Sequence, residues 1–327
     1  MSRRPVDLAG RLLDRLGVLD RVIRRAGGRY VLAYHRVLTP AEARAEWCHP
    51  AIWIRPETFD EHLRFFSRIG RIVTLAELLR SPDDGQPRFA ITFDDAWIDN
   101  YTHALPVLAR HDARACFFVP TGAVSTGRLF WTEELALKIG QALEVGQRKS
   151  LLAHFGWHDD EDENLLPLVM AYVEGLKDLA IPERDAVVAE LYSKHGISPE
   201  PVQGRVMNWD QIRELAARGH TIGSHSKTHL ILRGVEPARV DEELVESKQI
   251  IERELGSGVD YFCFPNARYD DVSSSRVLAA GYSHGFRIHN LKVTSAADRA
   301  LVPRFSASES NSLPSHLKMR FARASLR

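Results

Sequence analysis

The strongest constraint on the fold is an alternation, beginning at Tyr30, of short apolar runs with segments of helical periodicity. Runs that are apolar at successive positions are typical of strands buried on both faces of a parallel sheet. The predicted strands cover 30–35, 71–75, 88–95, 113–120, 220–225, 260–265 and 282–286. The predicted helices cover 56–70, 100–111, 208–218, 236–256 and 272–280. The alternation predicts an α/β fold whose parallel sheet is open or closed into a barrel.

Residues 1–29 differ in composition from the rest of the chain. They hold eight arginines and three aspartates, an excess of 8 − 3 = +5 charges. An apolar stripe at helical spacing is formed by Leu8, Leu12, Leu16, Leu19 and Ile23. This pattern predicts an amphipathic basic helix that is an appendage to the domain. Packing against the body of the domain is slightly favoured, and resting on an anionic membrane surface is the alternative.

Residues 30–327 are expected to form one main domain, interrupted by a helical insertion at 122–205. Helical periodicity recurs in that segment around 130–142, 165–176 and 184–192. It also contains the acidic run 158–164, which is expected to be a solvated turn because clustered like charges seldom pack inside a domain. The role of the insertion is left open by the sequence.

Composition excludes several classes of protein. The 327 residues carry 43 Lys and Arg against 43 Asp and Glu, so a charge excess suited to nucleic acid is absent from the sequence. No apolar stretch reaches the length of a membrane-spanning helix, and the arginines and acids near the start argue against a signal peptide. The three cysteines, at 48, 116 and 263, are widely spaced, and Cys116 and Cys263, which lie in apolar runs, are expected to be reduced core thiols. A cytoplasmic protein is expected, peripheral at the inner membrane face if residues 1–29 contact lipid.

Two adjacent acids, Asp94 and Asp95, end the strongly apolar run RFAITFDD. Either could simply cap the helix that follows. The carboxyl ends of parallel strands are, however, where α/β folds bind ligands. Two carboxylates this close repel each other, so a nearby cation would stabilise the pair.

A second polar cluster, His225 and His229, follows the predicted strand 220–225. On a helical turn this spacing puts both imidazoles on one face, although a His-x3-His pair also arises by chance. Two histidines and one aspartate form the ligand set of a catalytic zinc or related divalent ion with open positions. The second aspartate would then be free to act as a base.

TFDDAWIDNY (92–101) resembles the TFDDG motif of the polysaccharide deacetylases, the chitin deacetylase-like carbohydrate esterases of family four. SHSKTH (224–229) resembles their H-S/T-x-x-H motif, and LAYHRV resembles the opening strand of a branch with a YHRV signature. The resemblance covers roughly residues 30–310. It implies a distorted (β/α)7 barrel, with Asp94 as catalytic base and with Asp95, His225 and His229 as metal ligands.

The chain departs from that family in two motifs. Ala96 occupies the position of the usual glycine, a mild change unless the backbone there needs a positive φ. The third motif, often R-x-P-Y, is FPNARY here. The resemblance implies substrate contacts from Pro265, Asn266 and Tyr269 in this loop, but the usual preceding arginine is missing.

The proton donor to the leaving amine is the least determined residue. His35 lies at the carboxyl end of the first strand, on the same side of the sheet as the acids, so we expect it to be the general acid. The alternative is that it only binds substrate or supports the residues that do. His289 and His316 are the other candidates. The neighbouring Arg36 is expected to form a structural ion pair.

The resemblance implies a metal-dependent hydrolase that removes N-acetyl groups from amino sugars of a poly- or oligosaccharide or of a lipid-linked glycan precursor, as in exopolysaccharide or capsule biosynthesis. Its partner would be an N-acetylated glycan and its cofactor one divalent metal, with Zn²⁺ ahead of Co²⁺, Ni²⁺ or Mn²⁺. The alternatives are an O-acetyl esterase or other C–N hydrolase with the same metal centre, and a catalytically inactive glycan-binding barrel. The sugar and the oligomeric state stay open.

Overall fold

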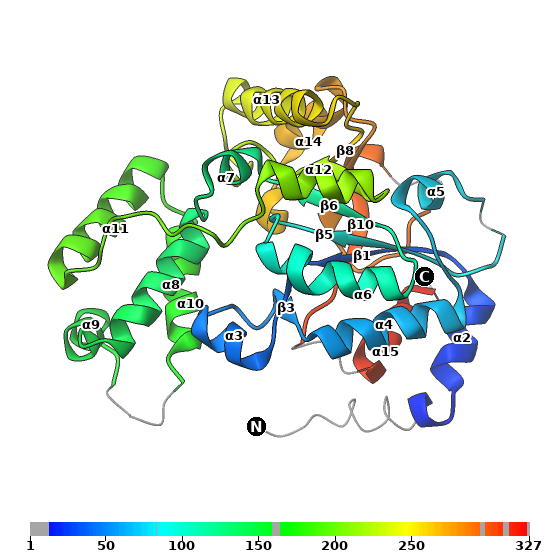
Figure 1. Ribbon diagram of the computed structural model, residues 1–327, viewed down its shortest axis with the longest axis horizontal. Helices are drawn as coiled ribbons and strands as arrows, with labels where there is room; N and C mark the ends of the chain where they lie inside the picture. The colour runs from blue at the N-terminus through cyan, green and yellow to red at the C-terminus, as the bar shows by residue number, and fades with distance from the viewer. Residues whose placement is uncertain (1–12, 83, 159–163, 295–297, 310–313, 326–327) are drawn as a thin grey trace. The chain divides into compact units, whose positions relative to one another are not determined.

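The computed structural model describes residues 13–82, 84–158, 164–294, 298–309 and 314–325. Within these residues, seven parallel strands close into a barrel, because β1 pairs with both β10 and β5. In order around the barrel the strands are β1 (Arg29–Tyr34), β10 (Val302–Ser306), β9 (His284–Ile288), β8 (Tyr261–Cys263), β7 (Thr221–Ser224), β6 (Ala115–Val119) and β5 (Arg88–Phe93). The predicted (β/α)7 barrel is confirmed (Figure 1).

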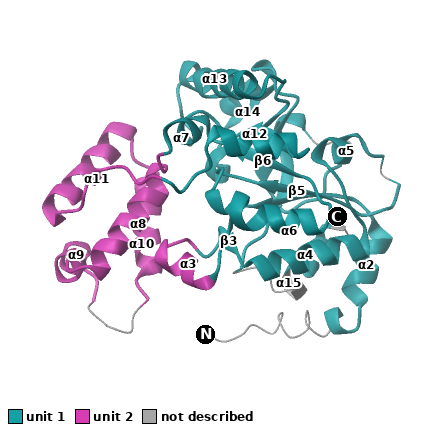
Figure 2. Cartoon of the chain, in the orientation of Figure 1, with its two compact units in different colours: residues 1–39, 50–127, 204–327 teal, residues 40–49, 128–203 magenta. Residues whose placement is uncertain are grey.

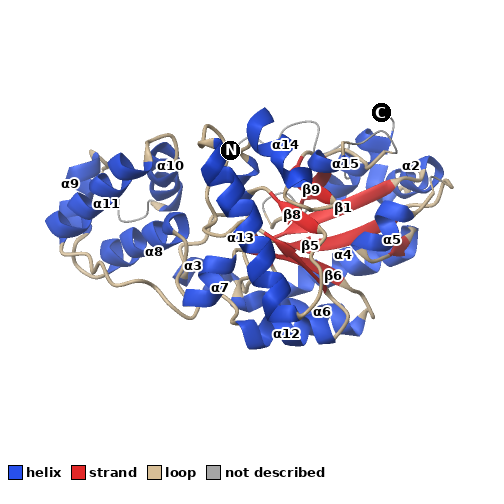
Figure 3. Cartoon of the chain, turned by 90° about the horizontal axis from the view of Figure 1, so that it is seen from above, coloured by secondary structure: helices blue, strands red, loops and turns tan. Residues whose placement is uncertain are grey.

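Short strands and helices complete the barrel. Outside the barrel ring, β4 (Arg71–Ile72) pairs with the start of β5, and β2 (Arg36–Val37) pairs with β3 (Trp53–Ile54). The helices around the strands (Figure 3) are α2 (Val18–Ala26), α4 (Pro56–Ile69), α5 (Leu75–Arg80), α6 (Leu105–Arg110), α7 (Thr121–Thr126), α12 (Trp209–Ala217), α13 (Pro237–Leu255), α14 (Asp271–Ala279) and α15 (Pro314–Ser325). A π-helical turn, Asn100–Ala104, precedes α6. β10 was not among the strands predicted from the sequence.

Alternate residues of the strands pack into different clusters. One cluster contains Val31, Ala90, Phe118 and Val302, whereas the intervening strand residues pack with helical residues such as Phe59. Because side chains alternate along a strand, Asp94 lies on the same face of its strand as Ala90. Both faces are apolar, which explains why these strands have nearly continuous apolar sequences.

The chain forms two compact units, coloured separately in Figure 2. Unit 1 comprises residues 1–39, 50–127 and 204–327, and unit 2 comprises 40–49 and 128–203. The helices of unit 2 are α3 (Pro40–Ala45), α8 (Trp131–Glu144), α9 (Arg148–Phe155), α10 (Leu166–Leu176) and α11 (Ile181–His195). The sequence placed an insertion at 122–205; in the structure, residues 40–49 join that unit, and α7 belongs to unit 1. Most of the acidic run, 159–163, lies outside the described residues.

Unit 2 has an apolar core of its own. Its buried residues include Leu135 and Ile139 of α8, Val169 of α10 and Leu191 of α11. Since these residues pack with one another rather than within a single helix, the segment is a folded helical unit and not a long loop.

The N-terminal helix α2 uses its apolar stripe for packing. Leu19 and Ile23 are buried in the main core, and Asp20 accepts a 2.8 Å hydrogen bond from Arg68 of α4. Arg21, Arg24 and Arg25 are exposed. The earlier part of the predicted stripe, residues 1–12, lies outside the described residues. Across the described part of the chain, every helix is too short or too polar to span a bilayer.

His220 provides a test of the barrel core through pH. Its Nδ1 accepts the backbone N–H of Ala115 at 3.1 Å, and burial, with Arg114 nearby, lowers its pKa to about 4. Between the ordinary pKa of 6.5 and about 4, the unfolded chain binds a proton that the folded chain does not, so the free energy of unfolding falls as the pH falls. The full loss of unfolding free energy from this pKa difference is about 3 kcal/mol. We expect His220→Asn, whose amide oxygen can accept the same bond, to lose less stability than the wild type in urea unfolding between pH 7 and 4.5.

The matched control is His158→Asn, because His158 is exposed. Its pH dependence should follow the wild type. An unchanged pH dependence in His220→Asn would contradict the assignment.

Candidate metal and catalytic site

The carboxyl end of β5 carries both acids. Asp94 and Asp95 are 2 % and 4 % exposed. The backbone N–H of Asp94 donates to the Tyr34 carbonyl at 3.0 Å, so the β1–β5 register continues and brings His35 alongside Asp94. Directly afterwards the backbone turns through the left-handed region, with φ of 76° at Asp95 and 55° at Ala96. Ala96 therefore takes the conformation that favours glycine, at a cost of about 1 kcal/mol.

Both histidines converge on one oxygen of Asp95. The Nε2 atoms of His225 and His229 each lie 3.2 Å from Oδ1 of Asp95. The helical turn assumed in the sequence analysis is wrong, because His225 follows the end of β7 and the backbone has positive φ at Ser226 (65°) and His229 (57°). An irregular loop brings the two rings together, with their centroids 5.0 Å apart.

The donor set fits a divalent metal. Nδ1 of His225 lies 2.8 Å from the carbonyl oxygen of Cys263, which can only accept, so this nitrogen carries a proton. In the neutral ring, Nε2 then carries a lone pair, and it faces a carboxylate oxygen. Two acceptors at 3.2 Å require a proton or a cation between them. One carboxylate and two imidazoles, with ligand atoms within 4.8 Å of one another, match the ligands that zinc takes in catalytic sites.

The pKa shifts of Asp95 and His225 show that a proton can occupy the place between them that a metal would take. Burial raises the pKa of Asp95, but the hydrogen bonds to His225 and His229 outweigh it and hold this pKa well below its usual range. Burial lowers the pKa of His225, but Cys263 and Asp95 outweigh it and raise this pKa well above its usual range. A metal ion at Asp95 would therefore have to displace a proton from His225.

Asp94 is bound to a different cation, Arg304 of β10. Nη1 and Nη2 of Arg304 each donate to one Asp94 oxygen at 2.7 Å. Arg304 is 1 % exposed and is held in turn by Thr92 Oγ1 at 3.0 Å and Cys263 Sγ at 2.8 Å. Burial raises the pKa of Asp94, but the charge and hydrogen bonds of Arg304 outweigh it, so the net pKa is lowered and the carboxylate is ionised.

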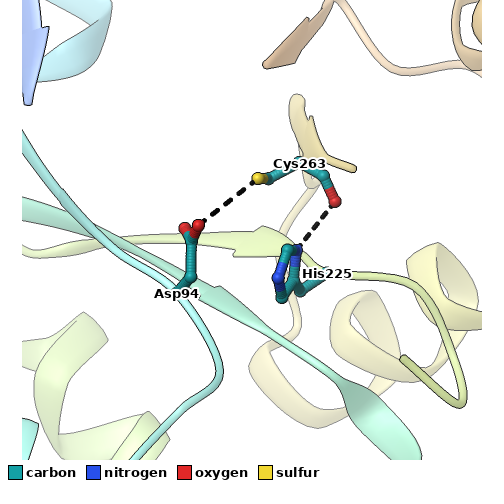
Figure 4. Close-up of side chains that lie close together, drawn as sticks. All are labelled: Asp94, His225 and Cys263. Atoms are coloured by element: carbon teal, nitrogen blue, oxygen red, sulfur yellow. Dashed lines mark hydrogen bonds between the residues drawn. The ribbon is translucent and has the colours of Figure 1, made fainter. Parts of the chain in front are cut away.

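A second group of potential ligand atoms, Asp94, His225 and Cys263, is shown in Figure 4. The Cys263 thiol lies 3.7 Å from Asp94, and the carbonyl of the same residue accepts from His225. A metal here would lie next to the Arg304 guanidinium, and two cations repel each other. The set around Asp95 is therefore the better metal site, and Asp94 remains available as a base.

His35 is the nearest of the general-acid candidates to Asp94 that the structure describes. Its Nε2 lies 3.8 Å from Asp94 Oδ2, and its side chain is 19 % exposed. His289 is exposed just after β9. His316 lies on α15, but its side chain is outside the described residues.

The third-motif loop follows β8, also at the mouth of the barrel. Pro265 is buried, whereas Asn266 is exposed with φ 52°. The Tyr269 hydroxyl accepts a 2.7 Å hydrogen bond from Arg287, and its ring packs on Phe264 at 4.9 Å. Asn266 is therefore accessible to solvent, whereas Tyr269 is engaged within the fold, and substrate binding by this loop stays a prediction.

Sequence reasoning missed two residues that contact the aspartates. Arg304 lies in the short run VPRFS, and a charged residue inside an apolar strand is a signal that an acid must lie opposite. Trp97 follows the Asp pair, and its Nε1 donates to Asp95 Oδ2 at 3.1 Å. From the sequence alone a tryptophan is interpreted as a core residue, because the acceptor of its N–H is known only from the structure.

Comparison with known proteins identifies the family. The sequence model of the polysaccharide deacetylases matches residues 81–151 and 168–285, more than half of the chain. The chain belongs to the polysaccharide deacetylase family. A curated relative named "Putative polysaccharide deacetylase YxkH", from Bacillus subtilis (strain 168), is 28% identical over 76 residues, which is 23% of this chain and 27% of that protein.

Solved deacetylases share the fold over most of the chain. The Streptococcus pyogenes deacetylase PplD, in complex with acetate, matches 90% of this chain and 98% of its own, with a TM-score of 0.59 and 18% identity. IcaB from Ammonifex degensii matches 92% of this chain and 98% of its own, with a TM-score of 0.55 and 18% identity. A de-N-acetylase from Aggregatibacter actinomycetemcomitans matches 89% of this chain and 98% of its own, with a TM-score of 0.54 and 15% identity.

The pairing of Asp95 with two imidazoles gives a prediction for this deacetylase family member. Zinc binding should release protons at pH 7, because the metal replaces a proton on His225, and its affinity should fall as the pH falls. Calorimetric titrations in buffers of different ionisation enthalpy measure that release. His225→Ala should abolish tight binding, whereas His289→Ala, which removes an exposed imidazole, should bind zinc like the wild type. Equal binding by His225→Ala and the wild type would rule out this site.

Proposed function

We propose that this protein is a metal-dependent N-deacetylase of amino sugars in a glycan. The observation that carries the proposal is the separation of two adjacent carboxylates: Asp95 Oδ1 lies 3.2 Å from each of two imidazole nitrogens, while both oxygens of Asp94 accept hydrogen bonds from Arg304 at 2.7 Å. A ligand set beside a separate base is the arrangement that hydrolysis by activated water needs. A binding module has no use for the base, which disfavours the inactive barrel.

Asp95, His225 and His229 would hold the divalent metal, with zinc as the first candidate from the donor set. When bound, the metal supplies Lewis-acid chemistry: it polarises the acetyl carbonyl and lowers the pKa of water. Asp94 accepts the proton of the water that attacks the carbonyl carbon. Arg304 fixes the direction of the Asp94 lone pairs and keeps the carboxylate ionised until that moment.

His35 is proposed as the general acid. After attack, the C–N bond breaks, the amine takes a proton and acetate leaves. His35 lies beside Asp94 and is partly exposed, so it can reach both the reacting group and solvent. The buried Nδ1 of His35 has no hydrogen-bond partner in the described part of the protein, which leaves Nε2 as the atom for proton transfer.

The relatives and this site support the proposed substrate class. One solved relative is a de-N-acetylase, and another binds acetate, which supports an N-acetyl group on a poly- or oligosaccharide or lipid-linked precursor. The same centre acting on an O-acetyl ester is the second candidate, because Asp94 would serve either reaction.

We also propose a cytoplasmic location, with the arginines of α2 available to an anionic membrane surface.

Asp94→Asn separates catalysis from metal binding. The amide has nearly the shape of the carboxylate but cannot accept the proton of water, so acetate release from N-acetylglucosamine oligomers should fall by about 10²–10⁴-fold. Zinc content should stay at about one ion per chain, measured by elemental analysis. Asp95→Asn is the matched change on the neighbouring acid, and it should lower metal affinity as well. Retained activity in Asp94→Asn would contradict its role as base.

Changes at Arg304 should move the pH profile. Without this cation, burial raises the pKa of Asp94, so the base becomes protonated at a higher pH and the acid limb of kcat/KM shifts upward. Arg304→Lys keeps the charge but loses the bidentate geometry, and we expect about a tenfold lower kcat/KM with a smaller shift than in Arg304→Met.

Arg304→Met leaves a buried charge unpaired and should cost about 3–5 kcal/mol of stability, so its folding is checked by circular dichroism. Arg304→Lys provides the profile if the other variant unfolds. An unshifted acid limb of kcat/KM in a folded variant would show that Arg304 does not control the pKa of the catalytic base.

A further inference from the structure

Oδ2 of Asp95, the carboxylate oxygen that does not face the histidines, is held by a hydrogen bond from Trp97. Oδ1 of Asp95 faces the two histidines, whereas Oδ2 accepts the indole N–H of Trp97 at 3.1 Å. Trp97 is 1 % exposed, so this hydrogen bond is shielded from water. A carboxylate held at one oxygen presents the other in a fixed direction.

The Trp97 ring is itself held by a buried cation. The guanidinium carbon of Arg36 lies 4.0 Å from the ring centroid. Arg36 is 4 % exposed, and its Nε donates to Asp99 Oδ2 at 2.9 Å. The other Asp99 oxygen accepts the backbone N–H of Val37 at 2.7 Å. A stacked guanidinium and a flat indole fit each other closely, and a lysine would not reproduce that contact.

The backbone on both sides of Trp97 is also fixed. Trp97 forms an antiparallel bridge with Val206, in which Met207 N–H donates to the Ala96 carbonyl at 2.8 Å and Ile98 N–H donates to the Arg205 carbonyl at 2.9 Å. The bridge fixes the backbone of Trp97, and the indole cannot turn away from Asp95 without leaving Arg36.

From these contacts we infer that Trp97 is a positioning residue, which through its N–H orients Asp95 for metal binding and is itself held in place by Arg36 and Asp99. The inference rests on the proposed metal site. Outer hydrogen-bond partners of metal ligands typically change metal affinity by about 10–100-fold when removed. The expected effect lies on metal affinity and on coordination geometry, with little effect on the fold, because phenylalanine fills most of the indole volume.

The test is Trp97→Phe, with Trp209→Phe as the matched control. Trp209 lies in the same unit, and its Nε1 donates to Ser125 Oγ at 3.0 Å and not to an aspartate. Zinc affinity is measured by competition with a chromogenic chelator, geometry by the visible spectrum of the Co²⁺-loaded protein, and the fold by the melting temperature of the metal-free protein. We expect about 10–100-fold weaker zinc binding and an altered Co²⁺ spectrum for Trp97→Phe, with both unchanged for Trp209→Phe.

Each outcome separates the inference from the metal site itself. If the wild type binds no zinc, the proposed function fails. If the wild type binds zinc and Trp97→Phe binds it within twofold of that affinity, only the inference fails. Equal losses in both tryptophan variants, or a lower melting temperature with unchanged affinity, would show a structural role and overturn it too. Should Trp97→Phe not fold, Arg36→Lys tests the same contacts, with a several-fold loss of zinc affinity expected and an unchanged affinity contradicting the inference.

Discussion

Closure of the barrel between β1 and β5 is the constraint on which the site depends. Six consecutive residues of each strand pair in parallel register, from Arg29 with Arg88 to Tyr34 with Phe93. One residue beyond this pairing in each strand direction, His35 lies beside Asp94. On its other edge β1 pairs with β10, and this connection brings Arg304 within bonding distance of an acid 210 positions away in the sequence. Parallel pairing thus gathers groups from distant segments at one end of the barrel, where α/β folds bind their ligands.

The adjacent acids then acquire different chemistry because the backbone changes between them. Asp94 still follows the alternation of the strand, so it shares a face with Thr92 and meets Arg304. Asp95 lies at φ 76°, outside the strand geometry, and its carboxylate turns to the imidazoles instead. Left-handed conformations at non-glycine residues cost about 1 kcal/mol or more each. This strained turn directs two adjacent like charges to different cationic partners, and under the proposed function it leaves one acid for a metal and the other for proton transfer.

Six of the seven barrel strands, together with the acid and histidine clusters, were predicted from the sequence because these signals are local. A long apolar run that ends in Asp94 and Asp95 can be recognised from neighbouring residues alone, and so can the spacing of His225 and His229. Arg304 could not be found in this way, because its role depends on which strands lie side by side in the barrel, and the proline and the arginine within β10 weaken its strand signal. The boundaries of unit 2 were also out of reach, because residues 40–49 join it through packing rather than through sequence adjacency.

The segment that follows unit 2 in the sequence supports the strained backbone beside the site, although it comes directly after a long insertion. The two ends of the long piece of unit 2 are bridged to each other at Arg128 and Gln203, with Leu129 N–H donating to the Val202 carbonyl at 3.0 Å. An insertion whose ends are clamped adds little loop entropy to the fold that carries it. Immediately afterwards, the residues from Arg205 to Met207 bond the backbone around Trp97. The left-handed turn at Asp95 and Ala96 is therefore held from outside the barrel strands, which is what a backbone strained at a functional site requires in order to persist.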